Sequence, residues 1–419
     1  MRSLEINPII GMVGVVDIGT AKICCLIAAP DMAGVPMLVG LGHQRSQGIK
    51  SGMVIDADDA ERSVRAAVGQ AERMAGTTLD KVVLSVSCGR LRSNGFKARA
   101  QVEGAVVKSV DIDRVIAGGE AYVERNNGRM LVQLTRADWQ LDGAKGVRDP
   151  RGLAGRELSV ELTAVTADEA PVRNLLGILE RCHLAVDGLV AAPFASAIAV
   201  ATPEERHAGV VVVDIGAGVT SSAVFSEGRI VHADAIPVGS QHITFDISRS
   251  LSTPVAEAER IKTLYGTLVK AQSDQAEYIS FPVTGEEDQG LAQISKARLR
   301  EIIAPRVEHV LSLVEERLKS AKLADFAAGR VILTGGGSQI LGLEQAWMRR
   351  FGGVVRIGRP KPLGRMPGSM CSPAFSTAIG LAVGEVTQGA SMGTATVRRS
   401  VPGAAGYLGR MRQWISESF

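Results

Sequence analysis

The sequence predicts an α/β protein with a duplicated core, and three loops carry that prediction. Two form a near-repeat: Asp17-Ile18-Gly19-Thr20-Ala21-Lys22 returns as Asp214-Ile215-Gly216-Ala217-Gly218-Val219-Thr220, each after a β-branched run. The third is Gly335-Gly336-Gly337-Ser338, after an apolar stretch. A Gly-rich hairpin tip exposes backbone N–H groups to which an anion can bind. Together the loops favour a phosphate chain held between two related halves over two ordinary buried hairpins.

The bulk composition is typical of a soluble, folded protein with more than one domain. The chain has 419 residues, 46% hydrophobic and 22% charged, enough for two or more cores. A formal net charge of +3 does not favour nucleic acid as the main partner. We expect neither a signal peptide nor a membrane-spanning segment. The cysteines lack zinc-type spacing, which indicates reduced thiols in a cytosolic protein; they are Cys24, Cys25, Cys88, Cys182 and Cys371.

Residues 12–83 are expected to form strands and one helix. Residues 12–45 alternate apolar runs with turn residues, which predicts strands joined by reversals. Residues 56–75 place apolar side chains at helical spacing along one face. The stretch Gln47-Gly48-Ile49-Lys50-Ser51-Gly52 superficially matches a P-loop, but Ile49 separates the glycine from the lysine, so the spacing fails.

Residues 84–164 have a different sequence pattern, short strand-like runs around one helix, which predicts a small inserted module rich in sheet. One helix is expected at 111–125, capped by Asp111. No phosphate-type loop occurs in this stretch, so we expect an accessory role. Short strand-like runs surround the helix, at 82–86, 104–110, 130–134 and 158–165.

The second half is expected to alternate helices with the second and third loops. An apolar, Ala-rich helix is predicted at 189–200, packed in the floor between the halves. Glu259 and Lys262 lie three residues apart and share a helix face; without context, a solvated ion pair is the ordinary interpretation. Further helices are expected at 168–183, 240–270, 295–323 and 343–350.

The C-terminal residues predict a tether that ends in an amphipathic helix. Residues 386–406 are rich in Gly, Ser, Thr and Ala, a composition typical of flexible linkers. The following apolar positions trace one helical stripe beside arginines, which fits an interfacial membrane anchor; a helix docked on its own domain is the alternative, and the linker makes it less favoured. One short helix binds reversibly, so stable attachment favours polymers. The anchor residues are Tyr407, Leu408, Arg410, Met411, Arg412, Trp414, Ile415 and Phe419.

The order of these features resembles the actin–DnaK–sugar-kinase superfamily, whose duplicated, ribonuclease H-like fold binds ATP. Two Asp-Ile-Gly hairpins, a Glu-x-x-Lys helix and a Thr-Gly-Gly-Gly loop occur in the superfamily's order. From about residue 12 to residue 419 the chain is similar to the FtsA family of bacterial cell division proteins. That similarity rests on segment 47–56, on the position of the inserted module and on segment 237–247, where Ser240 replaces a usual second glycine.

The resemblance implies that ATP and Mg²⁺ bind between the halves. Asp17 and Asp214 would face the Mg²⁺ and its water, with no direct protein ligand to the metal. Fast hydrolysis needs a positioned base, and none stands out, so we expect a binding protein with at most weak ATPase activity. The phosphates would be held by Gly19, Thr20, Lys22, Gly216, Gly218 and Thr220. The ribose and adenine would be approached by Gly239, Glu259, Lys262, Gly335, Gly336, Gly337 and Ser338.

The resemblance also implies partners. An FtsA-like protein would attach filaments of the tubulin-like protein FtsZ to the cytoplasmic side of the inner membrane at the division site. It would polymerise head to tail, bind anionic lipids and recruit later division proteins. The acidic tail of FtsZ is expected on a smaller subdomain, with Arg298, Arg300 and Arg306 as candidate contacts.

A basic cluster near residues 349–365 lacks interleaved aromatic residues, so we expect a solvated or lipid-facing surface there rather than a nucleic-acid site. An ATP-dependent kinase or chaperone of the superfamily, or a PilM-like pilus-assembly scaffold, remains an alternative. The implied parts are a first lobe (12–83 and 165–200), the inserted subdomain (84–164), a second lobe (201–250 and 325–385), its smaller subdomain (251–324), a linker (386–406) and the membrane-binding helix (407–419).

Overall fold

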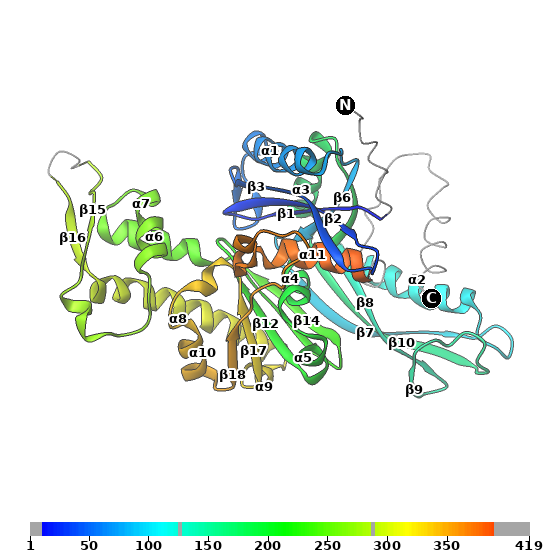
Figure 1. Cartoon of the computed structure of the whole chain (residues 1–419). Helices are drawn as coiled ribbons and strands as arrows, with labels where there is room; N and C mark the ends of the chain where they lie inside the picture. Colours follow the sequence, from blue (N-terminus) through cyan, green and yellow to red (C-terminus); the bar gives the residue numbers. More distant parts are fainter. Residues whose placement is uncertain (1–10, 125–127, 286–289, 389–419) are drawn as a thin grey trace, which may run out of the picture.

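Two β-sheets form the framework of the computed structural model, which describes residues 11–124, 128–285 and 290–388 (Figure 1). The first sheet has the order β11 (Ala185–Ala191), β6 (Lys81–Val86), β1 (Val13–Ile18), β2 (Lys22–Pro30), β3 (Pro36–Arg45). The second has the order β18 (Val354–Ile357), β17 (Arg330–Thr334), β12 (Val210–Ile215), β13 (Thr220–Ser226), β14 (Arg229–Ile236), β7 (Arg92–Gln101), β10 (Glu157–Asp168), β8 (Arg129–Leu141), β9 (Ala144–Val147).

The two sheets repeat one pattern of strands. In the first, β1 pairs antiparallel with β2 and parallel with β6. In the second, β12 pairs antiparallel with β13 and parallel with β17. The predicted duplicated α/β fold is therefore confirmed, and each predicted Asp-Ile-Gly hairpin joins the two antiparallel strands of one copy.

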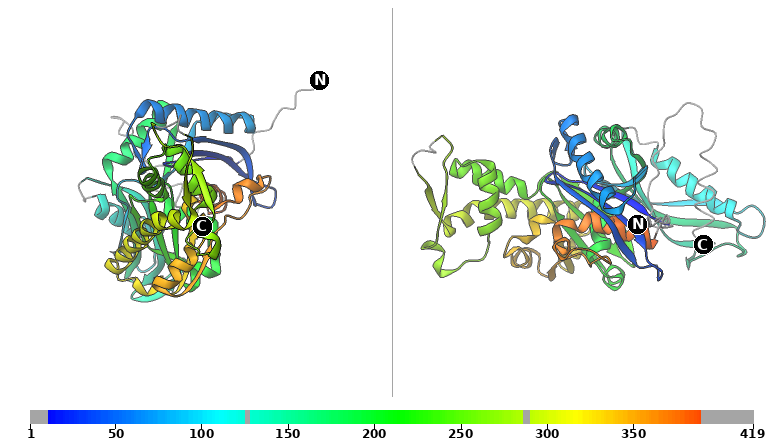
Figure 2. Two further views of the ribbon diagram at one scale, coloured as in Figure 1. Left: turned by 90° about the vertical axis from the view of Figure 1, so that its left-hand side faces the viewer. Right: turned by 45° about the horizontal axis from the view of Figure 1, so that its top comes forward.

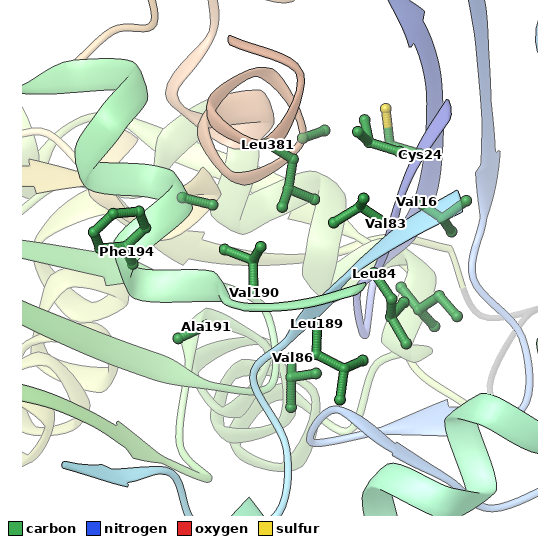
Figure 3. Close-up of a cluster of buried hydrophobic side chains, with 14 of the residues drawn as sticks. Val16, Cys24, Val83, Leu84, Val86, Leu189, Val190, Ala191, Phe194 and Leu381 are labelled. Carbon is green, nitrogen blue, oxygen red and sulfur yellow. The ribbon is translucent and has the colours of Figure 1, made fainter. Parts of the chain in front are cut away.

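The helices that cover the two sheets are exchanged between the halves of the chain. Helix α11 (Ser376–Gln388) comes late in the sequence but packs on β1 and β2 of the first sheet. Helix α4 (Ala192–Val200) comes earlier and packs on β12, β13 and β14 of the second. In Figure 3, Leu381 of α11 lies among side chains of the first sheet, including Val83 and Cys24. Each such buried Leu contributes about 1.5–3 kcal/mol of hydrophobic free energy.

The inserted module extends the second sheet. Its strands β7, β10, β8 and β9 continue outward from β14, and the seam is one residue pair, Asp234 opposite Arg92. Helix α2 (Ser109–Glu124) packs against β7, and Trp139 is fully buried in the module's own core. The module stands at one end of an elongated molecule (Figure 2).

The opposite end of the molecule carries the helices and hairpin of residues 240–320 (Figure 2). The helices α6 (Ser240–Leu251) and α8 (Lys296–Ser320) pack together, and α7 (Val255–Tyr265) packs on α6. The remaining strands are β15 (Tyr278–Phe281), β16 (Ala292–Ser295), β4 (Ile49–Lys50) and β5 (Met53–Val54). The remaining α-helices are α1 (Ala57–Ala75), α3 (Glu169–Arg181), α5 (Pro203–Ala208), α9 (Ala324–Ala327) and α10 (Leu343–Phe351).

One secondary-structure prediction is wrong at the junction of a strand with a helix. The predicted helix at 189–200 is a strand, β11, up to Ala191, and only then helix α4. A buried parallel strand is apolar throughout, so hydrophobic periodicity cannot separate it from a buried helix. By contrast, the helix predicted at 56–75 is confirmed as α1, with the Asp56 carboxylate accepting the N–H groups of Asp58 and Asp59.

The prediction for the inserted module is also wrong in part. No strand is present at 104–110; the strand lies earlier, at β7, whose mostly exposed polar residues conceal it in the sequence. Asp111 is not an N-cap, because α2 begins at Ser109. Its buried carboxylate instead accepts the N–H groups of Lys108 and Glu103, at 2.9 and 3.2 Å, and so holds the loop before the helix.

Helix α11 runs to Gln388, past the predicted start of the linker at residue 386. The rest of that linker and the predicted membrane-binding helix, 407–419, lie outside the described residues. Within the described ranges, no helix is long and apolar enough to cross a membrane.

Candidate functional site

The tips of the two Asp-Ile-Gly hairpins face each other between the lobes. A Cβ added to Gly218 of the second tip would lie 2.4 Å from the Thr20 hydroxyl and 2.9 Å from Ser51. The Thr20 hydroxyl also accepts the N–H of Gly52, at 3.0 Å. The sequence prediction that both tips contribute to one site therefore agrees with their position, and Gly218 is required by close approach.

A partly buried carboxylate lies behind each tip. Asp17 accepts the Ser85 hydroxyl at 2.6 Å, and Asp214 accepts the hydroxyls of Ser196 and Thr377. Burial raises the pKa of both carboxyls above their ordinary value, while these hydrogen bonds oppose the rise. Two partly buried acids facing one interlobe space fit a hydrated divalent cation, which would favour their ionised forms. Within the described residues, no group of three or more His, Cys, Asp and Glu side chains could itself hold a metal ion.

Lys22 lies between the two carboxylates and the segment before α11. Its ammonium donates to the Ala374 carbonyl and lies 3.6 Å from the centroid of the Phe375 ring, a cation–π contact. Burial lowers the pKa of Lys22, and the nearby charges of Asp17 and Asp214 oppose that effect. The partly buried Lys22 ammonium therefore offsets part of the negative charge of the two carboxylates without a ligand.

Some backbone N–H groups of the hairpin tips are used within the tips themselves. The N–H groups of Gly19 and Gly216 close their own turns, donating to Lys22 and Val219 carbonyls at 3.0 and 2.9 Å. These two glycines therefore shape the tips rather than offer donors. Ser240, in the place of a usual glycine, takes part through its backbone, because its N–H donates to the Gly216 carbonyl at 2.9 Å.

The second tip contains a polar group without a partner. The Thr220 side chain is 1% exposed, and its hydroxyl makes no hydrogen bond to the described residues. Buried hydroxyls are nearly always paired. An unpaired hydroxyl directly after the tip thus supports a polar ligand at this position.

The triple-glycine loop contributes one open glycine and two packed ones. A Cβ on Gly335 (φ +82°) would lie 2.2 Å from an Asp214 carboxylate oxygen, and one on Gly337 would lie 2.6 Å from Ile215. Gly336 has only Ala374 nearby, at 3.7 Å. The Ser338 hydroxyl is buried and donates back to the Gly335 carbonyl at 2.8 Å. Gly336 is therefore the member of this loop that a flat ring can approach.

The Glu-x-x-Lys helix points at the same region. Lys262 donates to Glu259 at 2.7 Å, to the Thr244 hydroxyl at 2.9 Å and to the Ser240 carbonyl at 3.3 Å. Glu259 is half exposed, whereas the Lys262 side chain is 9% exposed. Gly239 precedes Ser240 at the start of α6, and a Cβ there would collide with the carbonyls of the second tip. Lys262 therefore connects α7 to α6, whose first residue, Ser240, is hydrogen-bonded to the second tip.

A second candidate site is an open groove of about 500 Å³ along α6 and α8. Two of the predicted partner-binding arginines line it: Arg298, exposed and paired with Glu301, and Arg306, paired with Asp246. Arg300 does not line it, because its side chain is 14% exposed and ion-paired with Asp274. The lining residues are Asp246, Arg249, Ser250, Arg298, Glu301, Ile302, Pro305, Arg306 and His309.

Sequence reasoning missed several residues of both sites. Ser85, Ser196 and Thr377 hold the carboxylates but belong to no motif, since they arrive from β6, α4 and α11. Arg249 and His309 line the groove from α6 and α8. The only available signal was helical spacing, because Arg298, Arg306 and His309 recur on α8 at intervals that share a face.

Comparison with known proteins identifies relatives over nearly the whole chain. Residues 211–380 match the family model "Cell division protein FtsA", and residues 88–166 match "SHS2 domain inserted in FTSA". The chain is 35% identical to Cell division protein FtsA of Rhizobium meliloti (strain 1021), covering 97% of this chain and 95% of that protein. It is 33% identical to the FtsA of Neisseria meningitidis serogroup B, covering 97% and 98%, and 29% identical to that of Escherichia coli K12, covering 96% and 97%.

Solved structures with the same fold include a PilM–PilN type IV pilus biogenesis complex, with a TM-score of 0.62 at 17% identity over 91% of this chain and 100% of that one. MreB5 of Spiroplasma citri bound to ADP has a TM-score of 0.52 at 15% identity over 91% of this chain and 98% of that one. These likenesses show the actin-like fold.

Proposed function

Because the chain belongs to the FtsA family of cell division proteins, we propose that it is an ATP-binding anchor that attaches FtsZ filaments to the cytoplasmic side of the inner membrane. The observation that carries the proposal is the pair of opposed hairpin tips with a partly buried carboxylate behind each, in a chain similar to FtsA proteins over nearly its full length. Its task would be tethering and recruitment at the division site.

Nucleotide would bind between the lobes. Asp17 and Asp214 would face the hydrated Mg²⁺, which supplies positive charge beside the phosphates, and Lys22 with the tips would hold the phosphates. Glu259, Lys262 and the open Gly336 would approach the ribose and adenine. Both carboxylates are engaged by hydroxyl groups beside the proposed ion site, and neither is assigned as a positioned base, so at most weak hydrolysis is proposed. Occupancy would favour head-to-tail polymers by binding the assembled form better.

The groove along α6 and α8 is the proposed site for the acidic tail of FtsZ. Its cations, Arg249, Arg298 and Arg306, line an open groove of about 500 Å³. The acids present, Asp246 and Glu301, are already engaged by two of these arginines. A peptide carboxylate would compete for the same guanidinium groups and would give charge-assisted, salt-sensitive binding.

Arg298→Ala and Arg306→Ala are each expected to weaken binding of a synthetic FtsZ-tail peptide roughly tenfold. Arg306→Ala is expected to have the larger effect, because it also leaves Asp246 as an unpaired negative charge in the groove. Fluorescence anisotropy at two salt concentrations would measure the affinity. Lys319→Ala is the matched control, since Lys319 lies on the same helix, exposed and paired with Glu315 outside the groove. Equal losses in all three variants would contradict the groove assignment.

The proposed membrane anchor is the helix predicted at residues 407–419. A chain that ends at Ala405 is expected to lose flotation with anionic vesicles in the presence of ATP and Mg²⁺, while the full chain floats and carries FtsZ with it. Equal flotation of both chains would remove the anchor from the proposal and would move a superfamily kinase, chaperone or PilM-like scaffold ahead of it.

A further inference from the structure

The turn between β2 and β3 exposes apolar side chains at one end of the first sheet. Met32 is fully exposed, Val35 is 53% exposed, and Ala33 and Gly34 between them are also exposed. An isolated exposed side chain needs no explanation. Two of them on the tip of one protruding hairpin form a small apolar wedge.

The backbone of this tip is closed on itself. The Asp31 N–H donates to the Val35 carbonyl at 2.9 Å, and the Gly34 N–H donates to the Asp31 carbonyl. The Asp31 carboxylate accepts the N–H groups of Ala33 and Val35, each at 2.8 Å. The turn is therefore fixed, its carboxylate is engaged, and few backbone groups would need water if the tip entered an apolar environment.

An unpaired cation lies beside the tip. Residues near Gly364 run alongside the start of β3, where the Leu38 N–H donates to the Gly364 carbonyl at 2.9 Å. The next residue, Arg365, is exposed and has no ion-pair partner among the described residues. Of the basic cluster predicted as a solvated or lipid-facing surface, Arg350 and Arg356 are instead committed to glutamates. Arg365 is thus available to an external anion.

The chain leaves the described structure at this same end. Helix α11 begins beside Lys22, at the start of β2, where Phe375 contacts the lysine ammonium. It then runs along β2 towards the hairpin tip, as both views show (Figures 1 and 2). If it is a random coil, the part of the predicted linker (386–406) that follows Gln388 would span on the order of 20–25 Å. A bilayer held by the predicted anchor would therefore be within reach of the tip.

We propose that the β2–β3 tip is a second, interfacial membrane contact, in which Met32 and Val35 enter the headgroup region of an anionic bilayer and Arg365 meets lipid phosphate. The inference rests on the proposed function, because the terminal anchor must first bring the membrane close. A second copy of this chain is the less suitable occupant: two side chains cover far less than the roughly 800 Å² per partner of a stable protein interface. A lipid surface needs only shallow insertion.

The test uses the full chain with ATP, Mg²⁺ and vesicles of phosphatidylglycerol and phosphatidylethanolamine. The double variant Met32→Ser/Val35→Ser is expected to raise the lipid concentration for half-maximal flotation roughly tenfold, and Arg365→Glu about threefold. The control Val269→Ser/Leu341→Ser removes two comparably exposed side chains of the second lobe and is expected to leave flotation unchanged. Unchanged flotation of the Met32/Val35 variant overturns the proposal.

Two further measurements separate the possible failures. Loss of flotation by the chain ending at Ala405, with unchanged flotation of the hairpin variant, would retain the anchor and overturn only the second contact. A drop in vesicle-free sedimentation of the hairpin variant would instead assign the tip to contacts between copies.

Depth measurement gives a direct readout. In a Met32→Trp/Trp414→Phe chain, brominated lipids are expected to quench the new tryptophan, since Trp139 and Trp347 are fully buried. Absence of quenching overturns the proposal.

Discussion

Replacing Gly380 by alanine is expected to lower the free energy of unfolding by about 3 kcal/mol, the upper end for overpacking a core. Gly380 lies in α11 where it crosses α4, and an added Cβ would lie 1.7 Å from the Ala195 carbonyl oxygen. That oxygen belongs to helix backbone, so relief requires the two helices to separate. Because the entropy of unfolding grows with chain length, the melting temperature of this 419-residue chain is expected to fall by about 3–5 °C.

The same substitution is expected to disturb the proposed nucleotide site. Ser196 follows Ala195 on α4, Thr377 precedes Gly380 on α11, and both donate to Asp214. Gly177→Ala is the matched control, because a Cβ on this residue of α3 meets nothing within 4 Å. It is expected to leave stability unchanged or raise it by up to about 1 kcal/mol. A Gly380→Ala protein as stable as this control would show that the helix crossing tolerates a methyl group.

Asp214→Asn is expected to stabilise the protein without nucleotide and to weaken Mg²⁺-dependent ATP binding at least tenfold. Burial raises the pKa of this carboxyl above its ordinary 3.8, so its ionised form opposes folding at neutral pH. The amide is neutral and can still accept the Ser196 and Thr377 hydroxyls. Each unit by which folding raises this pKa corresponds to about 1.4 kcal/mol of stability lost by the ionised form at neutral pH, whereas the loss of a carboxylate beside the ion costs roughly 1.5–3 kcal/mol of binding.

The pH dependence of folding stability shows the direction of the Asp214 contribution. The folded protein binds the Asp214 proton more tightly than the unfolded chain, so this residue's contribution to stability falls as pH rises from 3.8 through the raised pKa. The advantage of Asp214→Asn is therefore expected to grow over that window and then to level off. Urea unfolding from acidic to neutral pH measures it. Asp187→Asn, at an exposed ion pair with Lys81, should change stability by less than about 0.5 kcal/mol. A constant difference across pH would contradict the argument.

The parts of the site that are local in sequence could be predicted, and the parts assembled from distant segments could not. Each hairpin needs its aspartate, glycines and returning strand within a few residues, so Asp17 and Asp214 were visible as a repeated pattern. Ser85, Ser196 and Thr377 reach these carboxylates from three other elements, and nothing in their neighbours distinguishes them from ordinary buried hydroxyls. Only the packing reveals them.

The same distinction applies to the fold. Helix α1 has one polar and one apolar face and a capping aspartate, so its limits followed from the sequence. From Gly188 onward strand β11 is buried on both faces, and it continues without a break into the buried helix α4, so no change of period marks the boundary. For the groove, spacing along α8 indicated which arginines share a face, but the commitment of Arg300 to Asp274 depends on a partner from another segment.

The exchange of α4 and α11 between the lobes limits how this chain can be divided. Each sheet is covered on one face by a helix that belongs to the other half of the chain. In addition, β7 pairs with the edge of β14, and Gly364 pairs with the start of β3. A cut in the connection after Val200 would therefore yield two fragments, each with an uncovered sheet. The repeated strands of each half form their own sheet, but each sheet needs a helix from the other half. The two halves are therefore complementary pieces rather than independent domains.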